Sequence, residues 1–260
     1  MTDELLVERT GDGVLTVTLN RPRVLNAWTP AMEEGWFAVL ADADADRETR
    51  VVVVTGAGPG FCAGADIAGS VDDLVAGGAP LPQRSERSYA PLLGTPVIAA
   101  VNGACAGVGL AVALQADIRF VAADAKLTTA FTRRGLVAEH GVAWLLQRAV
   151  GRGRALDLLL SARVFSGADA HAYGLAEFVL PADEVLPAAL AYARDLAVAC
   201  SPHAMATVKQ QLVDSDLTGP FEALLDADRA TRASFTWPDL QEGIRSWQER
   251  RPPRFPDRSS

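Results

Sequence analysis

The chain has 260 residues, 49% of them apolar and 22% charged, which is typical of a globular protein that buries one large core. Its formal net charge of −8 argues against nucleic acid as the main partner, because phosphate binding needs a basic surface. No apolar run reaches the length of a membrane span, and the N-terminus lacks the basic-then-apolar pattern of a signal peptide. The three cysteines, Cys62, Cys105 and Cys200, form no C-x-x-C pair. We therefore expect free thiols in a cytoplasmic protein without a membrane partner.

The first predicted elements are a strand and a helix. Residues 14–19 alternate apolar and polar side chains, as in a strand with one buried face, and Pro22 marks its end. Thr29 as N-cap, with Pro30 at the first helical position, predicts a helix that continues to about Leu40. These two elements begin an alternation of strands and helices that continues along the chain.

A buried strand and the glycine-rich turn after it form the stretch around which we expect the site to be organised. Residues 51–55 contain four consecutive valines, which suit a short strand buried on both faces. The turn at 56–60 does not fit the dinucleotide pattern G-x-G-x-x-G, because Phe61 replaces the third glycine and Pro59 has no N–H to donate. The alternative is an oxyanion site, in which backbone N–H groups stabilise the negative oxygen of a thioester.

A second strand and a second glycine-rich turn follow. Residues 66–94 carry a composition that breaks regular structure, and we interpret them as a mobile wall of the binding pocket. Residues 96–101 predict a buried strand, and residues 102–109 a turn that opens an apolar helix ending near Gln115. Two such turns supply what an oxyanion hole with two donors requires, one of them at a helix N-terminus.

The rest of the chain predicts two short strands and then helices. The strands are expected at 117–122 and 126–128, and the helices at 142–150, about 153–160, from the capping box Ser166–Asp169 to Gly174, at 185–200, and from the N-cap Ser201 through Trp247. The tail at 250–256 is expected to be extended or disordered. By itself this alternation favours an α/β core with a doubly wound sheet, followed by a helical part.

Two stretches carry a resemblance to a known family. Residues 61–67, Phe-Cys-Ala-Gly-Ala-Asp-Ile, resemble the F-x-A-G-A-D-I stretch of the crotonase (enoyl-CoA hydratase/isomerase) superfamily, and residues 20–27 resemble its N-R-P-x-x-x-N-A element. The resemblance extends along nearly the whole chain. It implies an α/β fold built as a right-handed spiral of β-β-α turns, in place of a doubly wound sheet. It also implies C-terminal helices that mediate a homotrimer or a dimer of trimers, and we expect a spiral core with the acyl-CoA site over 1–199 and a helical region over 200–260.

The resemblance also assigns roles to individual residues. Ala63 aligns with the first oxyanion donor and Val108 with the second, where the family often has glycine, and a valine keeps the backbone N–H. The resemblance places Gly64, Ala65 and Asp66 in the acyl-CoA site with Ala63, although Asp66 alternatively serves as a helix N-cap. The residues from Asn20 lie beside CoA in the family, so Arg21 and Arg23 either meet its phosphates or lie in a solvated turn. Coenzyme A is expected to enter with the substrate, and no other cofactor and no metal are expected.

The catalytic base is where the sequence departs from the hydratase pattern. Ala111 and Phe131 occupy the positions of the two glutamates of the best-known hydratases, and neither can hold water or move a proton. Glu139 matches the catalytic aspartate of some enoyl-CoA isomerases and the nucleophile of 4-chlorobenzoyl-CoA dehalogenase. One carboxylate is enough for a 1,3-proton shift, although an acid before a helix is also common for the sake of the helix dipole. His140 either hydrogen-bonds the thioester, orients Glu139, or is structural.

We therefore expect an acyl-CoA enzyme that isomerises a double bond through Glu139. Two alternatives remain: an enoyl-CoA hydratase that uses Glu139 with His140, and a non-catalytic subunit that binds acyl-CoA. Other enzyme classes are disfavoured. No tyrosine has a lysine four residues later, as a short-chain dehydrogenase requires, no G-x-S-x-G hydrolase motif occurs, and the histidines are not clustered as in a metal hydrolase.

Overall fold

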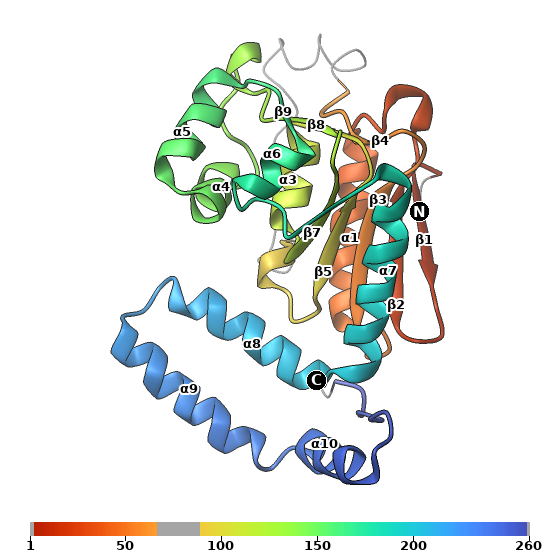
Figure 1. The fold of residues 1–260 in the computed structure, drawn as a ribbon, viewed down its shortest axis with the longest axis vertical. Helices are drawn as coiled ribbons and strands as arrows, with labels where there is room; N and C mark the ends of the chain where they lie inside the picture. The colour runs from red at the N-terminus through yellow and green to blue at the C-terminus, as the bar shows by residue number, and fades with distance from the viewer. Residues whose placement is uncertain (1–2, 67–88, 259–260) are drawn as a thin grey trace.

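The computed structural model describes residues 3–66 and 89–258 (Figure 1). The predicted pocket wall at 66–94 lies mostly outside these residues. The larger of two sheets has six strands in the order β1-β2-β3-β5-β7-β10, in which only β1 and β2 are antiparallel neighbours. Its strands are β1 (Leu5–Arg9), β2 (Val14–Leu19), β3 (Val51–Gly56), β5 (Val97–Val101), β7 (Ile118–Ala122) and β10 (Phe178–Leu180). Every residue of β3 and β5 is buried, as their continuous apolar runs predict.

A smaller sheet shows why the fold is a spiral. Its four short strands are β4 (Gly60–Cys62), β6 (Ala104–Ala106), β8 (Lys126–Thr128) and β9 (Phe165–Ser166), in that order. Strands β4, β6 and β8 are parallel, and each follows a strand of the larger sheet in the chain, after β3, β5 and β7 respectively. The chain thus repeats a turn that visits first one sheet and then the other. The spiral expected from the resemblance is confirmed, and the doubly wound sheet favoured by the alternation alone is wrong.

Helices cover the sheets and extend beyond them. The core helices are α1 (Pro30–Ala45), α3 (Val108–Gln115), α4 (Val142–Val150), α5 (Arg152–Ser161), α6 (Gly167–Ala172) and α7 (Ala182–Ala199), with short 3₁₀ turns η1 (Pro22–Val24), η4 (Ala90–Leu92) and η5 (Thr132–Arg134). Helix α7 packs across β2, β3, β5 and β7, as Figure 1 shows. The predicted N-caps Thr29, Ser166 and Ser201 each accept a backbone N–H in the first turn of their helix.

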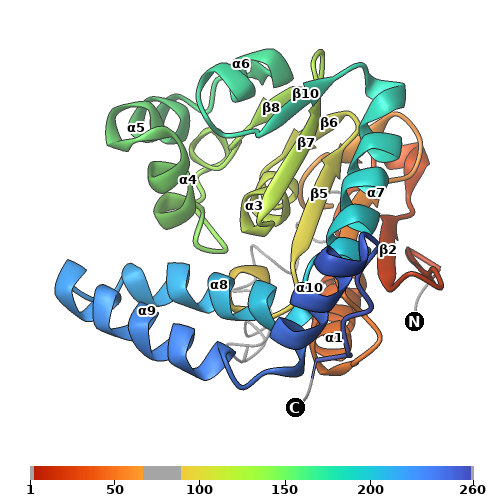
Figure 2. The same cartoon turned by 60° about the horizontal axis from the view of Figure 1, so that its bottom comes forward.

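Three C-terminal helices project from the core, namely α8 (Pro202–Ser215), α9 (Pro220–Ser234) and α10 (Pro238–Glu249). Helices α8 and α9 run side by side in both Figure 1 and Figure 2. All three helices expose large apolar side chains, and Trp247 on α10 is 80% exposed. The tail after α10 has no helix or strand among its described residues, as predicted, and returns to the core through Arg258, which pairs with Asp44 at 3.0 Å. The division into 1–199 and 200–260 stays a prediction.

Candidate active site

Two asparagine side chains hold the glycine-rich turn between β3 and β4. The buried Asn26 donates its Nδ2 to the carbonyls of Ala57, at 3.0 Å, and Gly60, at 2.8 Å. Asn102 donates to the carbonyl of Gly56 at 3.0 Å and accepts the N–H of the same residue at 3.2 Å. A Cβ on Gly56 would lie 2.1 Å from the Gly60 oxygen, so no side chain fits there. The turn is a closely packed link between the two sheets, and the asparagine of the N-A element serves to close it.

The residues after this turn correct one expected donor. The N–H of Ala63 donates to the carbonyl of Leu25 at 2.9 Å, so it is already bonded within the protein. A group with this partner cannot also stabilise a substrate oxygen without giving up its bond. The bond to Leu25 therefore disfavours Ala63 as the first oxyanion donor.

The N–H of Ala65 points away from the segment at 25–28, to which Ala63 is bonded. The N–H of Trp28 donates to Gly64 O at 2.8 Å, and the N–H of Asp66 donates to Trp28 O at 2.9 Å. Gly64 has a φ of +100°, which interrupts the strand alternation, so that Ala63 and Asp66 both face the segment at 25–28. Among residues 3–66 and 89–258, no acceptor is assigned to the N–H of Ala65, and this residue is exposed. Ala65 is therefore the better placed donor.

The second expected donor lies at the start of α3. Gly107, with φ of +53°, donates its N–H to Thr128 O at 3.1 Å and leaves Val108 as the first helical residue. The first N–H groups of a helix have no partner within it, and none is assigned to Val108 within the described part of the chain. A Cβ on Gly64 would lie 3.2 Å from Ala106 O, and a Cβ on Gly107 would lie 3.8 Å from Gly64 Cα. The two loops are therefore in contact, with the helix dipole of α3 directed at them.

The two positions that match the hydratase glutamates are apolar and buried. Ala111 is 1% exposed and Phe131 is 4% exposed. A Cβ on Gly107 would lie 4.0 Å from the Phe131 ring, so this ring packs beside the second loop. An apolar ring and a methyl group offer no hydrogen bond to a water molecule. Apolar side chains therefore fill the two positions next to the oxyanion loops, Ala111 and Phe131, at which a hydratase has glutamates.

Glu139 lies on a tight turn at the start of α4. The N–H of Val142 donates to Glu139 O at 3.0 Å, and the two central residues, His140 and Gly141, have φ of +51° and +75°. Positive φ at both central positions is the mark of a type I′ turn. Glu139 and His140 are half-buried, and α4 packs against α3. The carboxylate thus comes from an element that contacts the helix carrying Val108.

A family model described as enoyl-CoA hydratase/isomerase matches residues 9–258. The chain belongs to the enoyl-CoA hydratase/isomerase family. It is 34% identical to the 1,2-epoxyphenylacetyl-CoA isomerase of Escherichia coli (strain K12), over 97% of this chain and 98% of the relative. It is 35% identical to a probable enoyl-CoA hydratase of Rhodobacter capsulatus, over 95% of this chain and 96% of the relative.

Solved structures agree with this assignment. A probable enoyl-CoA hydratase/isomerase from Mycobacterium abscessus matches with a TM-score of 0.91 and 35% identity, over 98% of this chain and 99% of that one. Enoyl-CoA hydratase from Bacillus anthracis matches with a TM-score of 0.87 and 28% identity, over 97% and 99%. The predicted superfamily and fold are confirmed. This member of the enoyl-CoA hydratase/isomerase family is an enzyme whose substrate is a CoA thioester.

The two arginines expected beside CoA, Arg21 and Arg23, differ from each other in their contacts with the rest of the protein. Arg21 is bound within the protein: its Nη2 pairs with Asp66 at 2.8 Å and its Nε pairs with Glu4 at 3.2 Å. Asp66 is thus an ion-pair partner, and its alternative role as a helix N-cap concerns residues 67–88, which lie outside the described part of the chain. Arg23 lies exposed in η1, and no partner is assigned to its guanidinium within the described residues. Of the two, Arg23 presents the charge that a phosphate could meet.

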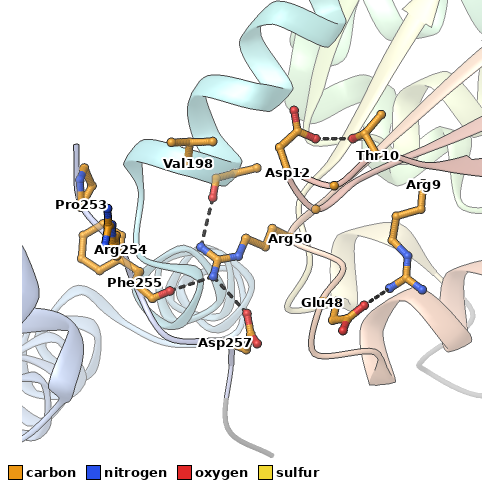
Figure 3. Close-up of a pocket in the computed structure, with 13 residues that line it drawn as sticks. Arg9, Thr10, Asp12, Glu48, Arg50, Val198, Pro253, Arg254, Phe255 and Asp257 are labelled. Carbon is orange, nitrogen blue, oxygen red and sulfur yellow. Dashed lines mark hydrogen bonds and ion pairs between the residues drawn. The ribbon is translucent and has the colours of Figure 1, made fainter.

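Figure 3 shows a pocket beside Arg50, at the start of β3, whereas the first oxyanion loop follows the end of that strand. The pocket has a volume of about 690 Å³ and is lined by the β1–β2 turn, the residues before β3 and the C-terminal tail. Arg50, directly before β3, donates to Phe255 O at 2.8 Å and pairs with Asp257 at 3.0 Å (Figure 3). The first oxyanion turn follows the opposite end of β3, roughly 18 Å away for a strand of this length, and the second follows the neighbouring strand β5. This polar pocket is where the tail docks on the core.

Two kinds of feature are absent from residues 3–66 and 89–258. No helix there is long and apolar enough to cross a bilayer. No three histidine, cysteine, aspartate or glutamate side chains gather there as metal ligands would.

Sequence reasoning overlooked one residue of this region, Gln115. It ends a helix whose eight residues are all buried, and it donates its amide to the carbonyl of His140 at 3.1 Å. The signal was present, since an amide in an otherwise apolar helix needs a hydrogen-bond partner.

Proposed function

We propose that this enzyme shifts the double bond of an enoyl-CoA, with Glu139 as the single carboxylate that moves the proton. The observation that carries the proposal is the burial of apolar Ala111 and Phe131 where a hydratase places its two glutamates. Addition of water needs groups that hold and activate that water, whereas a proton shift needs one base. The similarity to a relative named 1,2-epoxyphenylacetyl-CoA isomerase also supports an isomerase.

The proposed reaction uses the backbone of both loops. The N–H groups of Ala65 and Val108 bind the thioester oxygen of a 3-enoyl-CoA. Glu139 removes a proton from C2, and the electron pair of that C–H bond passes into a dienolate whose negative oxygen both N–H groups stabilise. The protonated carboxyl then returns the proton to C4, and the double bond lies between C2 and C3. No atom is gained or lost, and no cofactor other than the CoA of the substrate takes part.

His140 has a simpler explanation than catalysis. Its φ of +51° lies in the left-handed region, which histidine tolerates better than most side chains do. We therefore propose a structural role for His140 in the turn. A hydratase that uses Glu139 with His140, or a subunit that only binds acyl-CoA, would give different results in the experiment below.

The test compares the wild type with Glu139→Gln in single-turnover absorbance experiments on 3-enoyl-CoA and 2-enoyl-CoA. The exposed Glu34 of α1 offers a matched control as Glu34→Gln. The expected result is that Glu139→Gln lowers the isomerisation rate by about 10²–10⁴-fold and leaves a measurable residual rate, whereas Glu34→Gln keeps the wild-type rate. Hydration that survives Glu139→Gln would reject the single-carboxylate mechanism. Binding of acyl-CoA without turnover of either substrate in the wild type would identify a binding subunit.

We also propose a homotrimer or a dimer of trimers as the assembly. The support is the apolar surface on α8, α9 and α10, which includes Leu212, Phe221 and Trp247. Exposed apolar patches of this kind mark protein interfaces. Native mass spectrometry would give three or six copies if the proposal holds, and a monomer would reject it. The cytoplasmic location stays a prediction.

A further inference from the structure

The last residue of α3 is a buried amide in an otherwise apolar helix. Gln115 is 4% exposed, and its Nε2 lies 3.1 Å from the carbonyl oxygen of His140. A carbonyl oxygen can only accept a hydrogen bond, so the amide nitrogen must be the atom that faces it. Burial of an amide is unfavourable unless its groups are bonded. This hydrogen bond therefore explains how a glutamine is kept at the end of a buried helix.

The acceptor belongs to the turn that carries Glu139. His140 is the second residue of that turn and has a φ of +51°, a conformation that persists in a non-glycine residue only where its surroundings hold it. The turn is closed on one side by the bond from Val142 N to Glu139 O. The amide of Gln115 donates to the carbonyl of His140, within this turn, and so links the turn to α3.

We propose that Gln115 is a positioning residue that sets where the Glu139 carboxylate lies relative to the oxyanion hole. The inference rests on the proposed function. Helix α3 begins with Val108, whose N–H faces the thioester oxygen, and ends with Gln115, about 10 Å further along the helix axis. One fully buried helix thus carries a donor of the oxyanion hole at one end and the anchor of the base at the other. Proton transfer depends steeply on such distances, so release of the anchor slows the reaction more than it weakens binding.

The experiment uses Gln115→Met, which keeps the length of the side chain and removes the donor. Leu114→Met is the matched control, since it changes a buried residue of the same helical turn without touching a hydrogen bond. We expect kcat for isomerisation to fall by about 10- to 100-fold in Gln115→Met, with KM changed by less than about threefold. Leu114→Met should keep the wild-type kcat within about twofold. Gln115→Asn, which keeps the amide but shortens its reach, serves as the second variant if Gln115→Met does not fold, with a smaller loss expected.

A double-mutant cycle separates positioning from general destabilisation. In a Glu139→Gln background, Gln115→Met should cause no further loss of kcat, because the group that it positions is gone. The amide of Val142 should exchange its hydrogen faster in Gln115→Met than in the control, because the turn has lost its anchor.

Two results would overturn the inference. One is a kcat of Gln115→Met equal to that of Leu114→Met, together with unchanged exchange at Val142. The other is an equal loss of kcat in the wild-type and Glu139→Gln backgrounds, which is the pattern of a purely structural residue. Failure of the proposed function has a separate signature, namely isomerisation that keeps the wild-type rate when Glu139→Gln is the only change.

Discussion

Lys209 of α8 and Asp117, the residue before β7, form an ion pair with an Nζ–Oδ2 distance of 2.6 Å. The same ammonium group donates to the carbonyls of Thr95, at 3.0 Å, and Ala90, at 3.2 Å. Three bonds from one side chain therefore attach the projecting C-terminal helices to the spiral core.

Substitution of Lys209 should loosen this attachment. Lys209→Met leaves the Asp117 carboxylate without its cation, and we expect the free energy of unfolding to fall by about 2–3 kcal/mol. The value lies below that of a fully buried pair because the Asp117 side chain is 25% exposed. Urea unfolding followed by fluorescence would measure the change. The control is Arg229→Met, which breaks a pair whose arginine is 76% exposed and should cost less than about 0.5 kcal/mol. Equal losses in the two variants would contradict the anchoring role of Lys209.

The proposed second oxyanion donor can be removed without removing the helix. Proline is well tolerated at the first position of a helix, where its missing N–H has no helical partner, so Val108→Pro removes the donor alone. We expect kcat to fall by about 10²–10³-fold with a melting temperature near that of the wild type. Val108→Ala keeps the N–H and should lose far less activity. An active Val108→Pro enzyme would exclude this N–H from the mechanism.

The two N-terminal arginines should separate binding from stability. Arg23→Gln removes an exposed charge, and we expect KM for the CoA thioester to rise by about five-fold, an effect that added salt weakens. Arg21→Gln breaks the pairs with Asp66 and Glu4 and should lower the melting temperature instead. Steady-state kinetics at two salt concentrations, combined with thermal melts, would test both predictions on the two variants. A larger KM effect from Arg21→Gln would reverse the assignment.

The cysteines should react in a fixed order. Burial raises the pKa of Cys62 to about 11, in spite of a backbone hydrogen bond from Gly64 that lowers it, and burial also raises the pKa of Cys105 well above its usual value. Since the thiolate is the reactive form, only about one in a thousand Cys62 side chains is reactive at pH 8. Cys200 is half-buried and should be alkylated first by iodoacetamide. Peptide mass spectrometry would follow the order, with the urea-unfolded chain as the control in which all three cysteines react. Early labelling of Cys62 would contradict its packing.

Stability in acid should depend on Glu242 of α10. Two bonds from the Arg251 guanidinium and one from the Arg254 N–H lower the pKa of Glu242 to about 2, from an ordinary value of 4.5. A depressed carboxyl pKa stabilises the folded chain above about pH 4.5, and this contribution is lost as the pH falls toward 2. Glu242→Gln should therefore melt below the wild type at pH 7, and the gap should close between pH 4.5 and 2. Thermal melts across this range, with Glu34→Gln as control, would check it. A gap that persists at pH 2 would show a cause other than charge.

Local signals in the sequence predicted the helices and the strands β2, β3, β5, β7 and β8, but they missed the strands β1, β4, β6, β9 and β10. Thr29 and Ser201 begin helices where their side chains can cap the first turn, and this choice depends only on neighbouring residues. The valine run at 51–55 is a strand for an equally local reason. Helix ends were less exact, since α1 continues to Ala45, beyond the predicted Leu40. Packing against the core, which a short sequence window does not contain, extends the helix.

By itself the sequence determined the helices, the longer buried strands, the two glycine-rich turns and the family, because these depend on residue type and order along the chain. Only the tertiary structure decided which of the backbone N–H groups are bonded within the protein. Ala63 and Ala65 carry the same side chain two residues apart, and what separates them is the φ of Gly64 and the presence of Leu25 opposite Ala63. Distant segments likewise supply two other partners. Asp66, which pairs with Arg21, lies 45 residues away in the chain, and His140, which accepts from Gln115, lies 25 residues away. A backbone donor has no residue type of its own, so its availability depends on which distant segment the fold brings beside it.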